Sequence, residues 1–131
     1  MFRLMMVVMT IVMVFQPNFF AEEKLVIGIG AEGATMESAV SEVAGRASYF
    51  LIVDAEGILL EALENPYKDN RGSAGVSAAD FFAERNVTLV IAGRFGNKMK
   101  AALKAKEIAY MEFAGVVADA VAQVIKEYEK P

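Results

Sequence analysis

The 131-residue chain contains no cysteine, no histidine and no tryptophan. Without these side chains the protein cannot form a disulfide, a thiolate or imidazole metal site, or a nucleophile activated by histidine. Basic residues are also outnumbered, because 13 Lys and Arg stand against 17 Asp and Glu and the net charge is -4. This balance disfavours non-specific binding to nucleic acid. The composition predicts no nucleic-acid partner and leaves the redox compartment open.

One apolar run opens the chain at residues 4–15, between Arg3 and Pro17. It is shorter than the roughly 20 residues of a spanning helix and fits the apolar region of a secretory signal, about 7 to 15 residues. We expect residues 1–21 to be a signal peptide that exports the protein to the periplasm or outside the cell. Bulky Phe19 disfavours cleavage after Ala21, so a membrane anchor is the alternative, and a start codon placed too early is a third possibility.

Residues 22–131 are expected to form a single domain. Short apolar segments broken by glycine or charge, with helical periodicity only in the second half, predict the α/β class. A turn at residues 54–57 predicts an antiparallel hairpin between the second and third strands. The first helix is expected to bury Val76, Ala79, Phe82 and Ala83. The expected strands cover residues 25–29, 49–53, 58–63, 87–92 and 108–113, and the expected helices cover residues 73–85, 95–106 and 116–129.

The order of these elements also predicts how the sheet is assembled. Right-handed crossovers place the fourth strand beside the first. The resulting mixed five-stranded sheet has the order 3-2-1-4-5 with strand 2 antiparallel, and helices cover both faces. This is a three-layer α/β/α arrangement of the ribonuclease-H-like type.

A glycine pattern at residues 28–33 matches the dinucleotide fingerprint G-x-G-x-x-G, and Asp54 follows at a suitable distance. A true fingerprint begins a parallel βαβ unit, whereas Asp54 opens a hairpin. We therefore disfavour nicotinamide binding. The preferred interpretation places Gly28 in a crowded strand and Gly30 and Gly33 in a loop.

Four ordered motifs carry a family resemblance: Ser-Ala-Val-Ser-Glu-Val-Ala-Gly-Arg-Ala-Ser-Tyr-Phe at 38–50, Glu-Asn-Pro at 64–66, Gly-Ser-Ala-Gly at 72–75 and Val-Ile-Ala-Gly at 90–93. Over residues 25–128 the chain resembles the dinitrogenase iron-molybdenum cofactor biosynthesis family, of the NifX and NifB C-terminal type. The resemblance implies the ribonuclease-H-like fold. It also implies binding or carriage of iron-sulfur or molybdenum-iron cluster precursors.

The chain departs from that family where many members carry histidine. It has Val43 and Arg71 at the matching positions. A cluster therefore cannot be ligated here by thiolate or imidazole. Beyond the leader, soft atoms come from Met36, Met99 and Met111, and methionine on such elements is usually core filler.

The carboxyl ends of the first and fourth strands are expected to form the binding crevice. One helix is expected to begin there after the fourth strand, and the helix introduced by residues 71–73 is expected to open toward the same place; their N-termini favour an anion. The alternative is that the arginines there are solvated and form ordinary ion pairs. No metal ligand is predicted in the protein. The predicted ligand-binding residues are Ser41, Gly45, Arg46, Arg71, Gly72, Ser73, Gly75, Gly93, Arg94 and Asn97.

Enzymatic interpretations find little support. The serines have no histidine partner, no Ser-x-x-Lys occurs, and the first strand lacks the carboxylate of a metal-dependent nuclease. We predict no catalytic residue and expect a non-enzymatic carrier of an anionic metal-cluster precursor or other small anion. The alternative is a divergent protein-interaction or structural module that has lost the cluster site. The oligomeric state is not predicted.

Overall fold

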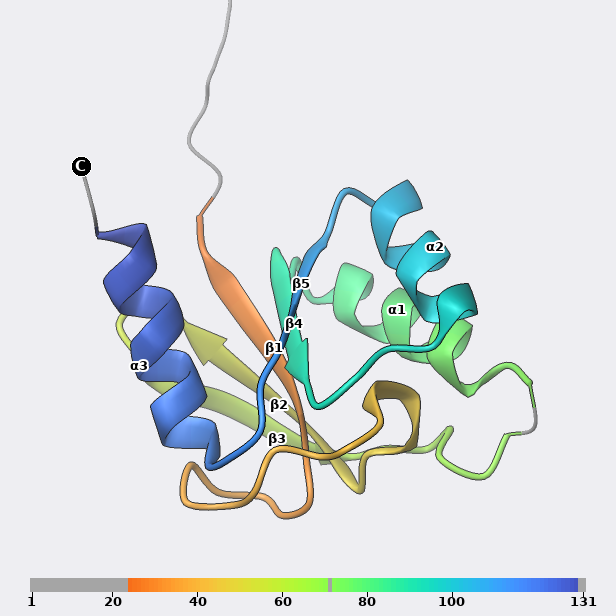
Figure 1. Cartoon of the computed structure of the whole chain (residues 1–131), viewed down its shortest axis with the longest axis horizontal. Helices are drawn as coiled ribbons and strands as arrows, with labels where there is room; N and C mark the ends of the chain where they lie inside the picture. Colours follow the sequence, from red (N-terminus) through yellow and green to blue (C-terminus); the bar gives the residue numbers. More distant parts are fainter. Residues whose placement is uncertain (1–23, 71, 130–131) are drawn as a thin grey trace, which may run out of the picture.

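The computed structural model describes residues 24–70 and 72–129, and its strands form one mixed sheet (Figure 1). The order β3-β2-β1-β4-β5 confirms the predicted topology. The predicted leader lies outside the described residues, so export and anchoring stay predictions. The strands are β1 (Val26–Ala31), β2 (Tyr49–Asp54), β3 (Leu59–Glu64), β4 (Leu89–Ala92) and β5 (Ala109–Glu112).

The pairing directions also agree with the prediction. β1 pairs antiparallel with β2 and parallel with β4, and β4 pairs parallel with β5. β2 and β3 form the expected hairpin, because the carboxylate of Asp54 accepts the N–H groups of Glu56 at 2.9 Å and Ile58 at 3.0 Å. The carboxyl ends of the parallel strands β1, β4 and β5 therefore lie at the same end of the sheet.

Helices cover both faces of this sheet (Figure 1). The helices α1 (Ala74–Glu84) and α2 (Asn97–Ala105) pack on one face, and α3 (Val117–Tyr128) packs on the other. A short 3-10 helix, η1 (Ala44–Arg46), precedes β2. Within residues 24–70 and 72–129, no helix combines the length and the apolar character needed to cross a membrane.

The buried face predicted for α1 is confirmed in part: Ala79 and Phe82 are buried and Ala83 is partly buried. In α3 the buried residues are Val117, Ala120, Val121 and Val124. In α1 the prediction for Val76 is wrong, because this side chain is 38% exposed. The side of α1 that faces the sheet does not include Val76. The buried residues of this helix are Ala74, Ala78, Ala79, Phe81 and Phe82.

The glycine pattern lies in a strand and a loop, and no dinucleotide-binding helix follows β1 in the described residues. Gly28 occupies a crowded strand as predicted, since a Cβ there would lie 2.6 Å from the ring of Phe82. The loop assignment of Gly30 is wrong, because this residue belongs to β1 and faces Ala47. Gly33 lies in the loop, in agreement with the prediction.

Candidate functional site

The carboxyl ends of the parallel strands are crossed by the chain segment at residues 41–46. The N–H of Gly93 donates to the carbonyl of Ser41 at 2.7 Å, and the N–H of Ala44 donates to the carbonyl of Arg94 at 3.0 Å. The contact is tight, because a Cβ at Gly93 would lie 2.6 Å from the carbonyl oxygen of Glu42. The segment therefore divides the predicted crevice into two pockets.

The first pocket has a volume of about 340 Å³ and lies between η1 and the beginnings of α1 and α2. The second has a volume of about 520 Å³ and lies between the ends of β4 and β5. The first is lined by Val43, Gly45, Arg46, Gly72, Ala74, Gly75, Gly96, Asn97, Lys98 and Met99. The second is lined by Ala39, Val40, Glu42, Gly93, Arg94, Phe113, Ala114, Gly115 and Val116.

Two helix N-termini face the first pocket. Their first intrahelical bonds are from Ser77 N–H to the Ser73 carbonyl and from Lys100 N–H to the Gly96 carbonyl. The N–H groups of the preceding three residues in each helix have no acceptor within that helix. The two ends are close together, because a Cβ at Gly75 would lie 2.8 Å from the Cβ of Met99. Their partial positive charges add at one place.

These N-termini also lack the usual negative partners. Neither α1 nor α2 has an acidic residue in its first turn or a side-chain hydrogen bond from its N-cap residue. By contrast, α3 carries Asp119 in its first turn. An acidic residue at such a position normally stabilises a helix. The N-termini of α1 and α2 thus keep their positive potential at the first pocket, whereas Asp119 offsets that of α3.

Two cations at the first pocket donate to carbonyl oxygens. Arg46 Nη1 donates to the Lys68 carbonyl at 2.7 Å, and Lys98 Nζ donates to the Gly72 carbonyl at 3.3 Å. Neither side chain has a carboxylate partner among the described residues, and none of the described residues lining this pocket is acidic. The pocket is therefore a concentration of positive charge on a protein with a net charge of -4.

Asn65 holds the floor of this pocket in place. Its side chain is 5% exposed, and its Nδ2 donates to the carbonyls of Gly45 at 3.0 Å and Ala47 at 2.9 Å. Its Oδ1 accepts the N–H of Tyr67 at 2.8 Å. Gly45 is fixed from the other side too, since a Cβ there would lie 2.8 Å from the backbone nitrogen of Gly75.

Among the described residues, five of the predicted site residues lie at the first pocket and four lie elsewhere. Gly93 and Arg94 line the second pocket, where Glu42 introduces a negative charge. The pockets separate because the backbone of residues 42–44 passes between them. The predicted residues at the first pocket are Gly45, Arg46, Gly72, Gly75 and Asn97.

Two described residues among those predicted, Ser41 and Ser73, line neither pocket. Ser41 is buried and its hydroxyl donates to the Val43 carbonyl at 3.3 Å, so it fixes the crossing segment. Ser73 is the exposed N-cap residue of α1, and its side chain makes no cap hydrogen bond. Arg71 lies outside the described residues.

Sequence reasoning missed Lys98 and Asn65. Lys98 is exposed and stands in the first turn of α2, beside the first pocket. Its position directly after Gly96 and Asn97 could have indicated this. Asn65 was part of a family motif without a role, although a polar residue between a strand and Pro66 is a common turn former.

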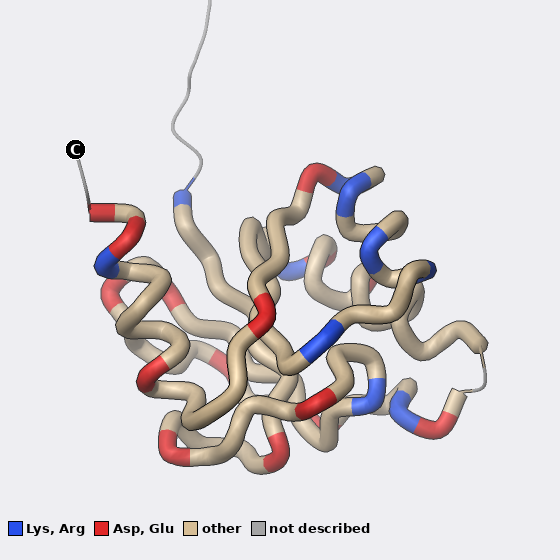
Figure 2. Tube along the Cα trace, in the orientation of Figure 1, with Lys and Arg blue, Asp and Glu red and all other residues tan. Residues whose placement is uncertain are grey.

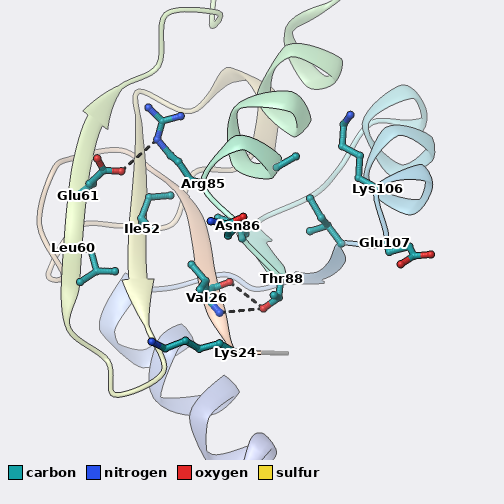
Figure 3. A pocket seen from close by; sticks show the side chains of 13 residues that line it. Lys24, Val26, Ile52, Leu60, Glu61, Arg85, Asn86, Thr88, Lys106 and Glu107 are labelled. Atoms are coloured by element: carbon teal, nitrogen blue, oxygen red, sulfur yellow. Dashed lines mark hydrogen bonds and ion pairs between the residues drawn. The ribbon is translucent and has the colours of Figure 1, made fainter. Parts of the chain in front are cut away.

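A larger cleft, about 720 Å³, lies at the opposite end of the sheet (Figure 3). It is bordered by Leu60 and Glu61 of β3 and by the residues that follow α1 and α2. Arg85 pairs with Glu61 at 3.3 Å across its upper part. Its charged border has both signs, and none of the predicted site residues that the structure describes lies there.

The site contains no ready-made metal centre. Across residues 24–70 and 72–129, no group of three or more acidic side chains is arranged to hold a metal ion, and the sequence has no cysteine or histidine. Fold and site together define a small α/β protein with a cationic pocket at paired helix N-termini.

A family model described as dinitrogenase iron-molybdenum cofactor matches residues 25–130, and the chain belongs to this family. Membership connects the protein with the handling of the iron-molybdenum cofactor. The family prediction made from the sequence motifs is thereby confirmed. A search of curated proteins found no match.

Solved structures share the fold. The apo form of the orange protein from Desulfovibrio gigas is 27% identical, with a TM-score of 0.74 over 82% of this chain and 92% of that chain. A proposed NifB protein from Thermotoga is 28% identical, with a TM-score of 0.65 over 79% of this chain and 88% of that chain. A proposed dinitrogenase protein from Methanocaldococcus jannaschii is 16% identical, with a TM-score of 0.56 over 79% and 90%, and shows the fold alone.

Proposed function

We propose that the first pocket binds an anionic metal-cluster precursor that already carries its own sulfide ligands, and that the protein carries this cargo without catalysing a reaction. The observation that carries the proposal is the meeting of two uncapped helix N-termini with Arg46 and Lys98 around a pocket whose described lining has no acid. Family membership supports a cluster as the cargo.

The chemistry of the lining defines how such a cargo would be held. With no thiolate or imidazole in the chain, hydrogen bonds and charge must supply the affinity. A charge-assisted hydrogen bond contributes about 1.5–3 kcal/mol, and a helix N-terminus adds about 0.3–1 kcal/mol. Met99 is the soft side chain in the wall of the pocket. The volume of about 340 Å³ suits a small inorganic cluster.

The second pocket is less suited to the same anion. Arg94 shares it with Glu42, whose carboxylate would repel a negatively charged ligand. The two pockets therefore make different predictions for their arginines, and this difference decides which one takes the cargo.

The experiment is an anaerobic titration with tetrathiomolybdate, followed by its optical absorption. Arg46→Ala and Lys98→Ala should each weaken binding about ten- to a hundredfold, which corresponds to the loss of one charge-assisted hydrogen bond. Arg46→Lys should restore only part of the affinity, because lysine lacks the planar guanidinium fork. Rising salt should weaken binding to the wild type more than to either alanine variant.

The controls separate the pockets and the charge effect. Lys126→Ala on α3 removes the same charge far from the pocket in sequence and on the other face of the sheet, and it should leave binding unchanged. Loss of binding in Arg94→Ala with normal binding in Arg46→Ala would move the cargo to the second pocket and contradict the proposal. Failure of the wild type to bind tetrathiomolybdate would favour the protein-interaction module.

A further inference from the structure

β5 forms an open edge of the sheet. It pairs with β4, and no other described strand pairs with it. The N–H of Ala109 donates to the carbonyl of Thr88, just before β4, and the N–H of Phe113 donates to the carbonyl of Ala92 at the end of β4. Since backbone groups alternate in direction along a strand, the N–H and C=O groups of Tyr110 and Glu112 point away from β4. This edge therefore offers donors and acceptors for another strand.

The opposite edge of the sheet is protected in a way that β5 is not. β3 carries the exposed acids Glu61 and Glu64, and its register with β2 shifts between Ile52 and Val53. Charged side chains and bulges are the usual devices that prevent an edge from pairing with another chain. β5 has no register shift and no lysine, so its protection is limited to its length of four residues and its one charged residue, Glu112.

A groove of about 420 Å³ runs between the edge of β5 and α2. Lys100 and Lys104 line it, and neither has a carboxylate partner among the described residues. Figure 2 shows several basic positions along this helix. Glu107 lies at one end of the groove, and Tyr110, 41% exposed, packs its ring against Phe95. An added strand would place alternate side chains beside the lysines.

The other face of β5 has the opposite character. Met111 and Phe113 are partly buried against the core beneath α3. Because side chains alternate across a strand, a strand added to β5 would place its remaining side chains on this apolar face. The edge thus favours a segment with acids on one face and apolar residues on the other.

We infer that β5 binds an extended acidic segment of a partner protein, which joins the sheet as an additional strand and places its carboxylates beside Lys100 and Lys104. Main-chain hydrogen bonds at Tyr110 and Glu112 would supply affinity, and the lysines would supply selectivity. This surface differs from the cationic pocket, and the inference does not depend on cluster binding.

The first test uses a short blocked peptide that alternates glutamate with valine, and the same peptide with lysine in place of glutamate. The acidic peptide should bind, with the largest amide shifts and the slowest hydrogen exchange at Tyr110 and Glu112. The double variant Lys100→Glu with Lys104→Glu should weaken binding about tenfold or more, because each exposed pair contributes about 0.2–1 kcal/mol and reversal adds repulsion. Lys126→Glu should not weaken it.

The second test separates strand pairing from simple charge attraction. Glu112→Pro removes an N–H that points away from β4, so the existing ladder stays intact. Glu112→Ala makes the same change in charge and keeps the N–H. The inference requires binding of the acidic peptide to Glu112→Ala and its loss, by about tenfold, in Glu112→Pro at an unchanged melting temperature.

Three outcomes would overturn the inference. The lysine peptide could bind as tightly as the acidic one, or the amide shifts could fall on β3 at Leu59–Glu64. Alternatively, the free protein could associate with itself through β5, with association lost in Glu112→Pro, which would make a second copy the occupant of the edge.

Discussion

At the end of the sheet where β1 and β4 finish, Arg46 and Lys98 donate to carbonyl oxygens, whereas at the opposite end Arg85 and Lys106 donate to carboxylates. The cations of the second group are neutralised by Glu61 and Asp80. Those of the first group keep their full charge for a ligand. Similar residue types therefore stabilise the fold at one end and favour anion binding at the other.

The helices sharpen this contrast. α1 and α2 both begin at the pocket end and finish at the end that holds the large cleft (Figures 1 and 3). Their C-cap residues are Arg85 and Lys106, whose positive charges suit the negative ends of the helices. At the pocket end the first turns lack acidic residues. A basic residue therefore stands at the C-cap of each helix, whereas neither helix has an acidic residue in its first turn at the pocket.

The largest effect on stability is expected at Asn65, which ties the pocket floor to the fold. Asn65→Ala removes three hydrogen bonds and leaves the carbonyls of Gly45 and Ala47 without this donor. The free energy of unfolding should fall by about 2–4 kcal/mol, at about 0.5–1.5 kcal/mol for each bond. Denaturant unfolding measures this change. Unaltered stability would mean that the carbonyls find other donors and that the floor is not held by Asn65.

Most of the fold could be predicted because its signals are local. The apolar runs marked the strands, Asp54 and Gly57 marked the hairpin, and handedness gave the strand order. The failures were local as well. Val76 fits the helical period but lies at the edge of the buried stripe of α1, and Gly30 continues β1 because its small size allows close packing against Ala47.

Individual features of the candidate site could be predicted from the sequence, but its division into two pockets could not. Glycines and basic residues after strands predicted a pocket at the carboxyl ends of the parallel strands, where the structure has two pockets. Residues 42–44 cross the carboxyl ends of the strands and separate Arg94 from Arg46. This path depends on tertiary hydrogen bonds between segments that are distant in sequence. The role of Lys98 also depends on how closely the beginnings of α1 and α2 approach each other. A helical sequence pattern gives no information on this distance.

The second prediction concerns the opposite end. Arg85 stacks 3.7 Å from the centre of the Phe81 ring, donates to the Phe81 carbonyl at 3.3 Å and pairs with Glu61. Arg85→Ala should lower the free energy of unfolding by about 1–2 kcal/mol through the lost cation–π contact and packing. Glu61→Ala removes only the partly exposed ion pair and should cost about 0.5 kcal/mol or less.

Thermal unfolding compares these two variants, and tetrathiomolybdate titration tests the contrast between the ends. Both variants should bind the anion like the wild type, because Arg85 and Glu61 line the distant cleft. Reduced anion binding in Arg85→Ala at a temperature where it is fully folded would show that the two ends are coupled, and the separation drawn above would fail.

The smallest expected effect lies where α1 and α2 end. Asn86 and Glu107 follow these helices in the left-handed region, with φ of 62° and 60°. Glycine adopts this conformation without strain, asparagine tolerates it, and a longer side chain such as glutamate is penalised. Glu107→Gly should therefore raise the free energy of unfolding by about 0.5–1 kcal/mol, and Asn86→Gly should raise it by less.

Calorimetric melting curves can resolve this difference, because about 1 kcal/mol shifts the melting temperature of a small domain by about 4–8 °C. Glu107→Ala is the matched control, since it removes the same charge but keeps a Cβ in the left-handed region. If Glu107→Ala stabilised the protein as much as Glu107→Gly, the gain would come from charge and not from the backbone. The left-handed backbone at Glu107 would then carry no measurable strain. The C-terminal ends of α1 and α2 would differ only in the charge of the residue at this position.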